Sequence, residues 1–586
     1  MGRLRIFRRI LSYYREKPSA TILGAASVVA SALIALQAPG LVRRAVDGLA
    51  GGAPLGSIFR YAILILAVTA GSGLFLFTQR RLLVGVSRHI EHRLRTDLYA
   101  HLLRLPPAFY MRERVGDLLT RATSDVGAVR MAVGPALMYA INTVTVMIVA
   151  TTFMLAIDPT LTGLALLAVP LVAGATRAFG GVIHSRWGQT QDALSRYTTR
   201  LQEHLVGLRV LRAYTCEATE IAEMATRSRD YVERSARLIR VSALFQPSLQ
   251  FLIGLSFVTV LGVGGNAVRT GSMTLGQFVE FNLYLVRMIW PMIAVGWVAN
   301  LVQRGAASMS RIEELFGQPP LDEPAAAPEP SRPHEGPASL ELRRLSFTFP
   351  SSSEPALREV SLQVGPGQRL AIVGEIASGK STLLSLIPRL LEPDRGTVFV
   401  DGVDILDFRL GDLRGRVALV PQGSFLFSAT LRDNIALANP EASEGEVVQA
   451  AVDAGLRPDL ERLPNGVETV VGERGVTLSG GQRQRVAIAR ALITRPGLLL
   501  LDDCLSAVDT ETERAVLSAL PRTTLVIATH RLAAAELCDR VVVLEGGAIA
   551  EIGAPGELAA RGGIYARLLA LQNLAGLGSS SEPRGK

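Results

Sequence analysis

Six long apolar stretches before residue 305 constrain the fold of this chain more than any other feature. Each has about the 20 residues that a helix needs to cross a bilayer. A run such as LTGLALLAVPLVAGA is apolar on every face, which argues against the alternative of buried helices in a large soluble protein. We therefore predict six transmembrane helices, at roughly residues 20–42, 58–80, 132–156, 159–180, 246–268 and 275–303.

The basic residues predict how these helices are oriented. Arginines crowd the segments after the second and fourth spans, which by the positive-inside rule face the cytoplasm. The N-terminal MGRLRIFRRILSYYREK is amphipathic and lacks a small-residue cleavage site, so we expect an interfacial helix, with both termini cytoplasmic in a multi-pass protein of the cell (inner) membrane. The arginines are Arg80, Arg81, Arg88, Arg93, Arg95, Arg104, Arg112, Arg114, Arg121, Arg130, Arg196, Arg200, Arg209 and Arg212.

The net charge of +9 favours an anionic membrane surface as a partner of the chain. We do not expect nucleic acid as a partner, because the sequence contains no module of interleaved basic and aromatic residues. The lipid bilayer is therefore the partner that composition alone predicts.

Composition divides the rest of the chain into further segments. Residues 1–18 form the interfacial elbow helix, and residues 19–316 form the membrane domain with helical intracellular extensions near 81–130 and 181–245. The proline-rich stretch at 317–339 is typical of a linker. Apolar strands and helices alternate over 340–575, which predicts an α/β domain followed by a flexible tail at 576–586.

This α/β domain contains a phosphate-binding loop. The segment GEIASGKST follows the apolar strand RLAIVG and precedes a helix, as the P-loop pattern requires. Its backbone N–H groups would wrap phosphates, Lys380 would reach the β- and γ-phosphates, and Ser381 would bind magnesium. Lysine is rare in this arginine-rich chain, which otherwise has only Lys17 and Lys586. The predicted ATP-binding residues are Gly374, Glu375, Ile376, Ala377, Ser378, Gly379, Lys380, Ser381 and Thr382.

Two adjacent carboxylates end a buried strand in LLLLDD. Parallel strands end at the edge of the sheet where nucleotides bind. We expect Asp502 to hold magnesium through water and Asp503 to orient or deprotonate the attacking water. The alternative is a pair of aspartates that only cap a helix.

The segment LSGGQRQRVAIARAL lies between the P-loop and the two acids, and in this order the motifs resemble those of ATP-binding cassette (ABC) proteins. The resemblance implies that Ser479, Gly480, Gly481 and Gln482 contact the γ-phosphate of a nucleotide held by the opposite subunit. Two chains must then pair to form each site. Six spans on the same chain as the cassette resemble the family's exporters, with coupling regions at Phe109–Val126 and Leu201–Glu217.

The remaining family motifs match residue by residue. The resemblance implies that Phe349 stacks on adenine, that Gln422 contacts magnesium, and that His530 senses the γ-phosphate. GERG at 472–475 resembles the loop before the signature, and SAVD at 506–509 resembles the D-loop. ATP and Mg²⁺ are the expected cofactors, with Ser381, Gln422 and Asp502 as metal ligands, and Asp503, His530 and Gln422 as catalytic residues.

Two positions depart from the family pattern. Ala377 replaces a usual glycine in the P-loop, and Asp503 replaces a catalytic glutamate that is one methylene longer. Aspartate beside an intact signature resembles the degenerate-site subunit of bacterial heterodimeric multidrug exporters related to the antigen-peptide transporter. We therefore expect a partner half-transporter that has the glutamate and a non-consensus signature.

Other interpretations stay open. The chain could instead form a homodimeric lipid or drug exporter in which aspartate suffices, or an ATP-gated channel or regulatory half. Glu280 and Arg287 lie seven residues apart in the last span, and they either line the substrate pathway or pair within the protein. Drugs, lipids and peptides are all possible substrates.

Overall fold

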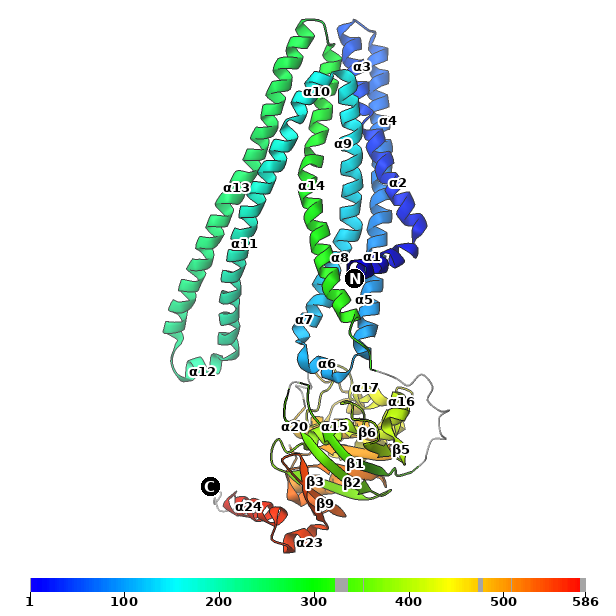
Figure 1. Cartoon of the computed structure of the whole chain (residues 1–586), viewed down its shortest axis with the longest axis vertical. Helices are drawn as coiled ribbons and strands as arrows, with labels where there is room; N and C mark the ends of the chain where they lie inside the picture. Colours follow the sequence, from blue (N-terminus) through cyan, green and yellow to red (C-terminus); the bar gives the residue numbers. More distant parts are fainter. Residues whose placement is uncertain (1, 322–335, 351, 473–477, 507, 580–586) are drawn as a thin grey trace. The chain divides into compact units, whose positions relative to one another are not determined.

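The structure, a computed structural model, describes residues 2–321, 336–350, 352–472, 478–506 and 508–579. It divides into a membrane unit, Met1–Leu103 with Arg114–Gln318, and an α/β unit, Arg104–Glu113 with Pro319–Lys586 (Figure 1). Among the described residues, six helices are long and apolar enough to cross a bilayer. The predicted fold class, an all-α membrane domain and an α/β domain, is confirmed.

The helices of the membrane unit extend far beyond the thickness of a bilayer. The second, made of α4, η1 and α5, has 50 residues, which corresponds to about 75 Å at 1.5 Å per residue. The helices are α1 (Gly2–Arg15), α2 (Pro18–Ala35), α3 (Ala38–Ala50), α4 (Leu55–Gln79), η1 (Arg80–Val84), α5 (Gly85–Arg104), α7 (Val115–Thr120), η2 (Arg121–Asp125), α8 (Val126–Met131), η3 (Ala132–Ala136), α9 (Leu137–Ile157), α10 (Pro159–Leu166), α11 (Ala168–Val206), α12 (Leu208–Ala213), α13 (Glu217–Arg269) and α14 (Leu275–Phe316).

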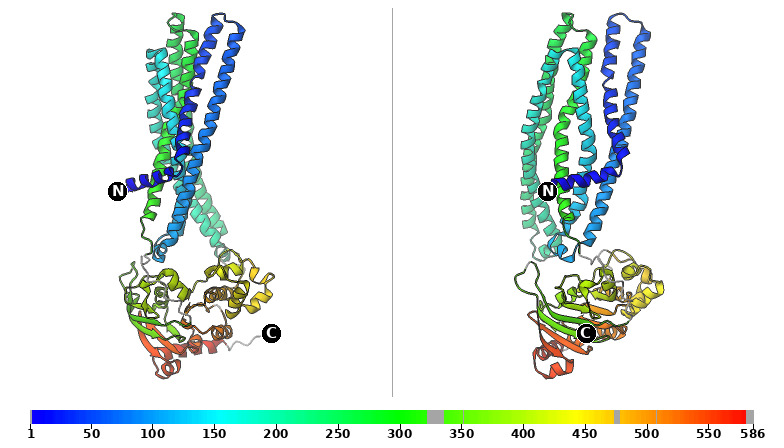
Figure 2. Two further views of the ribbon diagram at one scale, coloured as in Figure 1. Left: turned by 90° about the vertical axis from the view of Figure 1, so that its right-hand side faces the viewer. Right: turned by 45° about the vertical axis from the view of Figure 1, so that its right-hand side comes forward.

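The fourth and fifth spans separate from the others. α11 and α13 lie side by side and are joined by α12, and this hairpin diverges from α9 and α14 toward its α12 end (Figures 1 and 2). Large apolar side chains at that end are exposed in the single chain, including Val206, Val210 and Tyr214. Clustered exposed apolar side chains indicate a surface that another molecule covers.

The predicted interfacial helix forms as α1 and is fastened to the membrane unit by its side chains. The Arg9 guanidinium pairs with Glu313 of α14 at 2.8 Å and lies 3.8 Å from the ring centre of Phe316. Tyr13 donates a hydrogen bond from its hydroxyl to Asp97 of α5, also at 2.8 Å. These contacts join α1 to two of the helices that extend beyond the spans.

A buried carboxylate joins the helical extensions of the third and sixth spans, outside the predicted membrane segments. Asp125, in the π-helical turn η2, accepts a hydrogen bond from the Ser308 hydroxyl at 2.9 Å and a bidentate pair from the Arg311 guanidinium, with Nε at 2.9 Å. Burial raises the pKa of Asp125, but the Arg311 and Ser308 hydrogen bonds outweigh it, so the net pKa is below the usual value. The carboxylate is therefore held in its ionised form.

The α/β unit contains a six-stranded sheet of order β10-β9-β3-β8-β7-β6 and a four-stranded antiparallel sheet of order β2-β1-β4-β5. In the larger sheet only the edge strand β10 is antiparallel to its neighbour. The strands are β1 (Leu340–Phe347), β2 (Leu357–Val364), β3 (Arg369–Gly374), β4 (Val398–Val400), β5 (Val403–Asp404), β6 (Val417–Val420), β7 (Leu498–Asp502), β8 (Thr524–Ala528), β9 (Arg540–Glu545) and β10 (Ala548–Gly553).

Helices surround these sheets. They are α6 (Pro107–Arg112), α15 (Lys380–Leu386), η4 (Ile405–Asp407), α16 (Leu410–Arg416), α17 (Leu431–Ile435), η5 (Ala436–Ala438), α18 (Glu444–Asp453), α19 (Arg457–Arg462), η6 (Gly466–Glu468), α20 (Gly480–Leu492), α21 (Thr510–Ala519), α22 (Leu532–Ala535), α23 (Pro555–Ala560) and α24 (Ile564–Ser579).

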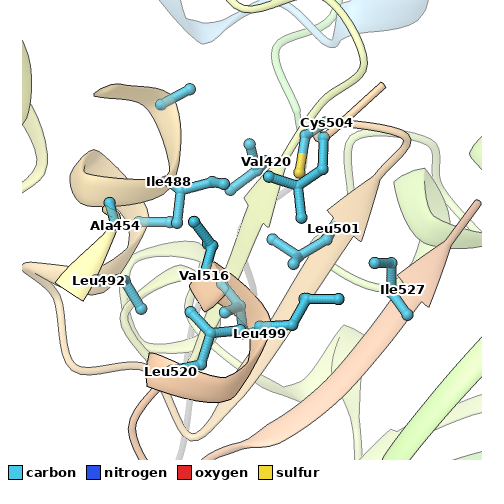
Figure 3. Close-up of a cluster of buried hydrophobic side chains, with 14 of the residues drawn as sticks. Val420, Ala454, Ile488, Leu492, Leu499, Leu501, Cys504, Val516, Leu520 and Ile527 are labelled. Carbon is cyan, nitrogen blue, oxygen red and sulfur yellow. The ribbon is translucent and has the colours of Figure 1, made fainter. Parts of the chain in front are cut away.

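Strand β7 is buried on both faces, which explains its continuous apolar sequence. Leu499 and Leu501 point into one core, where Figure 3 shows them with Val516 of α21 and Ile488 of α20. Leu498 and Leu500 alternate with them and point into the other core. Packing on both faces fixes the direction of β7 and hence the position of the acids at its end.

Element limits differ in places from the predicted segments. α14 ends at Phe316 and β1 begins at Leu340, but most of the predicted linker lies outside the described residues. Helix α24 continues to Ser579, past the predicted start of the tail at 576. The segment Arg104–Glu113 belongs to the α/β unit, where Leu321 donates a backbone hydrogen bond to the Arg104 carbonyl at 2.9 Å.

We expect Asp125→Ala to destabilise the membrane unit, because it leaves the Arg311 guanidinium and the Ser308 hydroxyl without their shared acceptor. Hydrogen bonds to charged groups contribute about 1.5–3 kcal/mol, so the midpoint of thermal unfolding in detergent should fall by several degrees. Glu233→Ala, which removes an exposed pair with Arg237 on α13, serves as the control and should change the midpoint little. Equal midpoints for the two variants would contradict the assignment.

Candidate nucleotide-binding site

The P-loop connects β3 to α15, and its backbone accepts only glycine at two positions. A Cβ on Gly374 would lie 2.3 Å from the Leu544 carbonyl oxygen, and one on Gly379 would lie 2.8 Å from the Ala356 carbonyl oxygen. Gly379 also has a φ of +102°, which side chains disfavour. Ala377 adopts a φ of +66°, so the alanine occupies a backbone conformation that suits the family's glycine better.

Lys380 lies across this loop. Its ammonium donates hydrogen bonds to the Gly374 carbonyl at 2.8 Å, the Glu375 carbonyl at 2.7 Å and the Ser378 hydroxyl at 3.2 Å. Burial lowers the pKa of Lys380 below its usual value, while the nearby Asp503 and Asp502 carboxylates act in the opposite direction. Its hydrogen bonds to the loop carbonyls keep the ammonium close to the loop amides that would wrap a phosphate.

Two predicted magnesium ligands meet in the structure. The Ser381 hydroxyl donates a hydrogen bond to the Asp502 carboxylate at 3.0 Å. Burial raises the pKa of Asp502, as does the neighbouring Asp503 carboxylate, and the Ser381 hydrogen bond opposes them. A hydroxyl and a carboxylate are the hard oxygen ligands that magnesium prefers, so these residues fit Mg²⁺, which when bound would neutralise phosphate charge.

Two predicted catalytic residues, His530 and Gln422, contact the carboxylate of the third, Asp503. His530 Nδ1 lies 2.8 Å from one carboxylate oxygen, and Gln422 donates a hydrogen bond to the other at 3.3 Å. The backbone of Asp503 has a φ of +45° and is held by a 2.8 Å hydrogen bond from its N–H to the Ala528 carbonyl. Gln422 thus contacts Asp503 directly, whereas Ser381 contacts Asp502.

The signature serine begins helix α20. Ser479 accepts a hydrogen bond on its hydroxyl from the Gln482 N–H at 3.2 Å, and Gln482 accepts one on its side chain from the Ser479 N–H at 2.8 Å. This capping box places Gly480 and Gly481 in the first turn, where free N–H groups and the helix dipole favour an anion. Residues 473–475 of the preceding loop, and Ala507 of the predicted D-loop, lie outside the described residues.

Phe349, the predicted adenine-stacking residue, lines a cavity of about 840 Å³. Its ring meets that of Phe347 edge to face, with 5.1 Å between ring centres. Pro106 and Met111 of the segment Arg104–Glu113 line the same cavity. An aromatic face on an apolar cavity fits a purine base.

Comparisons with known proteins agree with this geometry. The family model of the ABC transporter transmembrane region matches residues 21–292, and that of the ABC transporter matches residues 357–506. A Bacillus subtilis protein named probable multidrug resistance ABC transporter ATP-binding/permease protein YheI is 37% identical, over 90% of this chain and 91% of its own length. The chain belongs to the ABC transporter family.

Further relatives and a solved structure identify the class as the exporters. The multidrug resistance-like ATP-binding protein MdlA of Escherichia coli is 36% identical over 99% of both chains. An ATP-dependent lipid A-core flippase of Aromatoleum aromaticum is 35% identical over 97% of this chain and 96% of its own. The structure of a bacterial Atm1-family ABC exporter with ATP bound superposes with a TM-score of 0.78 and 26% identity, covering 97% of this chain and 99% of the other.

The two ionisable residues of the exporter's last span lie in different environments. Glu280 is buried, pairs with Arg43 of α3 at 3.3 Å, and accepts a hydrogen bond from the Tyr284 hydroxyl, also at 3.3 Å. Arg287 is exposed, and among the described residues it makes no hydrogen bond or ion pair. Pairing within the protein therefore accounts for Glu280, whereas Arg287 remains a candidate for the substrate pathway.

Sequence reasoning missed one residue of the site. Arg531 donates hydrogen bonds from its guanidinium to the carbonyls of Ser506 and Val508, both at 2.6 Å, and lies 3.4 Å from Glu513. It thereby joins the loop after β8 to the predicted D-loop of the same chain. Its position directly after His530 was the available signal, but the contacts depend on the fold of distant segments.

We expect Lys380→Ala to weaken ATP binding to this chain, because the variant loses the point charge nearest the phosphate-binding amides. A charge-assisted hydrogen bond contributes about 1.5–3 kcal/mol, or roughly 10- to 100-fold in affinity. Titrated photo-labelling with an azido-ATP measures the effect. The control is Lys17→Ala, an exposed lysine outside the α/β unit, and undiminished labelling of Lys380→Ala would argue against the P-loop assignment.

The ATP affinity of variants at Ala377 should depend on how well each residue tolerates the left-handed backbone of this position. Such a conformation costs a residue with a Cβ about 1–2 kcal/mol, and more for a β-branched residue. Ala377→Gly should therefore bind azido-ATP as tightly as the unaltered chain or more tightly, whereas Ala377→Val should bind several-fold more weakly. Equal affinities of the glycine and valine variants would show that the loop changes conformation when nucleotide binds.

Proposed function

We propose that this chain is one subunit of a heterodimeric ATP-driven exporter that moves hydrophobic or amphipathic substrates, such as drugs, lipids or peptides, out of the cytoplasm. Its own ATP site hydrolyses slowly, and its intact signature completes the fast site of a partner half-transporter. That partner would have the catalytic glutamate and a non-consensus signature. The contacts of Asp503 with Gln422 and His530 carry this proposal.

These contacts matter because they limit how far the base can move. The Asp503 carboxylate is bound on both oxygens and is only 17% exposed. Aspartate is one methylene shorter than glutamate, or roughly 1.5 Å of reach. A catalytic group misplaced by about 1 Å can lose on the order of 10²-fold in rate. We therefore expect slow ATP hydrolysis at this site, because the aspartate is short and its carboxylate is bound by Gln422 and His530.

The same site would bind ATP and Mg²⁺. The P-loop amides and Lys380 would bind the phosphates, Phe349 would stack on the adenine, and Ser381, Asp502 and Gln422 would hold the metal. Because Gln422 also donates a hydrogen bond to Asp503, its side chain would connect the bound magnesium to the catalytic base. These roles rest on the geometry above together with the resemblance to the family.

Pairing with a second chain is supported by both units. The signature helix α20 presents its first turn as an anion site. The connecting helix α12, at the end of the α11–α13 hairpin, exposes apolar side chains such as Val210, which is 59% exposed. We propose that a partner half-transporter covers this end of the hairpin. The arginine-rich extensions support a cytoplasmic location for this end of the hairpin and for both termini.

A homodimeric lipid or drug exporter is the second candidate. It is favoured by the relatives named as lipid A-core flippases, which match along nearly their whole length. In a homodimer Asp503 would act as the base at both sites. The two candidates therefore differ in whether the chain alone hydrolyses ATP.

The test is steady-state phosphate release by matched purified complexes. We expect Asp503→Ala to reduce turnover only a few-fold, because the partner's site continues. Replacing the partner's glutamate should reduce turnover by ~10² or more, the scale expected when a general base is lost. Asp412→Ala, which removes an exposed carboxylate of α16, is the control.

Two results would contradict this proposal. A loss for Asp503→Ala as large as that for the partner's variant would show that this chain's own site is not slow. Brisk hydrolysis by the purified chain without any partner would favour the homodimeric exporter instead.

A further inference from the structure

The C-terminal helix α24 reaches the loop after β8 through one side chain. The Gln572 carboxamide donates a hydrogen bond to the His530 carbonyl oxygen and accepts one from the Leu532 N–H at 3.0 Å. These two backbone groups flank Arg531. One glutamine therefore fixes the main chain on both sides of this arginine.

Helix α24 is itself firmly held at its start. The Glu551 carboxylate of β10 accepts hydrogen bonds from the N–H groups of Ile564, at 2.6 Å, and Tyr565, at 3.1 Å. The Tyr565 side chain is buried in the larger core. Gln572 follows seven residues later, about two turns, and so lies on the same face of the helix. The glutamine is thus presented to the loop by an anchored helix.

The loop needs such a support because the His530 side chain is not fixed by burial. The His530 side chain is 56% exposed, yet its Nδ1 lies 2.8 Å from Asp503. The Arg531 guanidinium bonds the carbonyls of Ser506 and Val508. Both contacts depend on where the backbone between His530 and Leu532 is held.

We propose that Gln572 is a positioning residue of the nucleotide site. It holds the main chain of His530 and Arg531 so that the imidazole stays on Asp503 and the guanidinium stays on the segment after the acids. Docking of α24 thereby sets the rate of ATP hydrolysis at this chain's own site without contributing to ATP affinity. The proposal rests on the chain's role as an ABC ATPase and not on whether the dimer is hetero or homo.

Three variants of the full-length complex test this role. Gln572→Ala removes both hydrogen bonds. Gln572→Glu keeps an acceptor for the Leu532 N–H but places a carboxylate oxygen against the His530 carbonyl. Leu571→Ala changes the adjacent residue, whose side chain is 63% exposed, and serves as the control.

Three measurements are made on each variant. Hydrogen exchange at the Leu532 amide reports the bond to Gln572 directly. Phosphate release is measured with the partner's glutamate replaced by glutamine, or on the homodimer if the chain works alone, so that only sites built on this chain's P-loop contribute. Azido-ATP titration gives the affinity in parallel.

We expect Gln572→Ala to speed exchange of the Leu532 amide and to lower hydrolysis roughly 10- to 100-fold, the scale of a small misplacement, with ATP affinity unchanged within about two-fold. Gln572→Glu should protect the Leu532 amide and still lower hydrolysis. Hydrolysis by Gln572→Ala equal to that of Leu571→Ala would overturn the proposal. A parallel fall in ATP affinity would also overturn it, since that would show a structural role only.

Discussion

The alignment of three parallel strands is the constraint on which the nucleotide site depends. Ile372 of β3, Ala528 of β8 and Asp502 of β7 are neighbours in the register of the larger sheet. The P-loop follows β3, the loop with His530 follows β8, and the pair of acids ends β7. All three therefore lie at the same edge of the sheet. Because both faces of the sheet are packed, none of the strands can slide without exposing a core. The sheet therefore fixes the points at which these three segments begin.

Local patterns in the sequence were sufficient for a large part of this organisation. The spans depend on the length and polarity of single segments, and each of the six is found in the structure. The P-loop and the cap at Ser479 depend on spacings of a few residues. The prediction that two carboxylates end a buried strand needed only the apolar run before them. Such features are set by interactions between near neighbours in the chain.

Contacts between distant segments could not be predicted in this way. Glu280 was singled out as a membrane-depth charge, but its partner Arg43 lies 237 residues earlier and no spacing joins the two. Gln422 is expected from the sequence to contact magnesium. Its hydrogen bond to Asp503 depends on the pairing of β6 with β7, which no local pattern predicts. The support of His530 by Gln572 likewise requires the path of the last helix. The left-handed backbone of Ala377 is likewise set by the fold, although the missing glycine marks the position in the sequence.

The exposed apolar end of the α11–α13 hairpin has a consequence for the life of the chain in a cell. Before assembly, this surface is open to water and to other exposed apolar surfaces, so an orphan chain is a natural client for chaperones and quality-control proteases. Binding of a partner that covers the surface would stabilise the folded chain by mass action. In the proposed heterodimer, the abundance of the chain should therefore follow that of its partner, and synthesis of the two in matched amounts becomes a condition for accumulating either one.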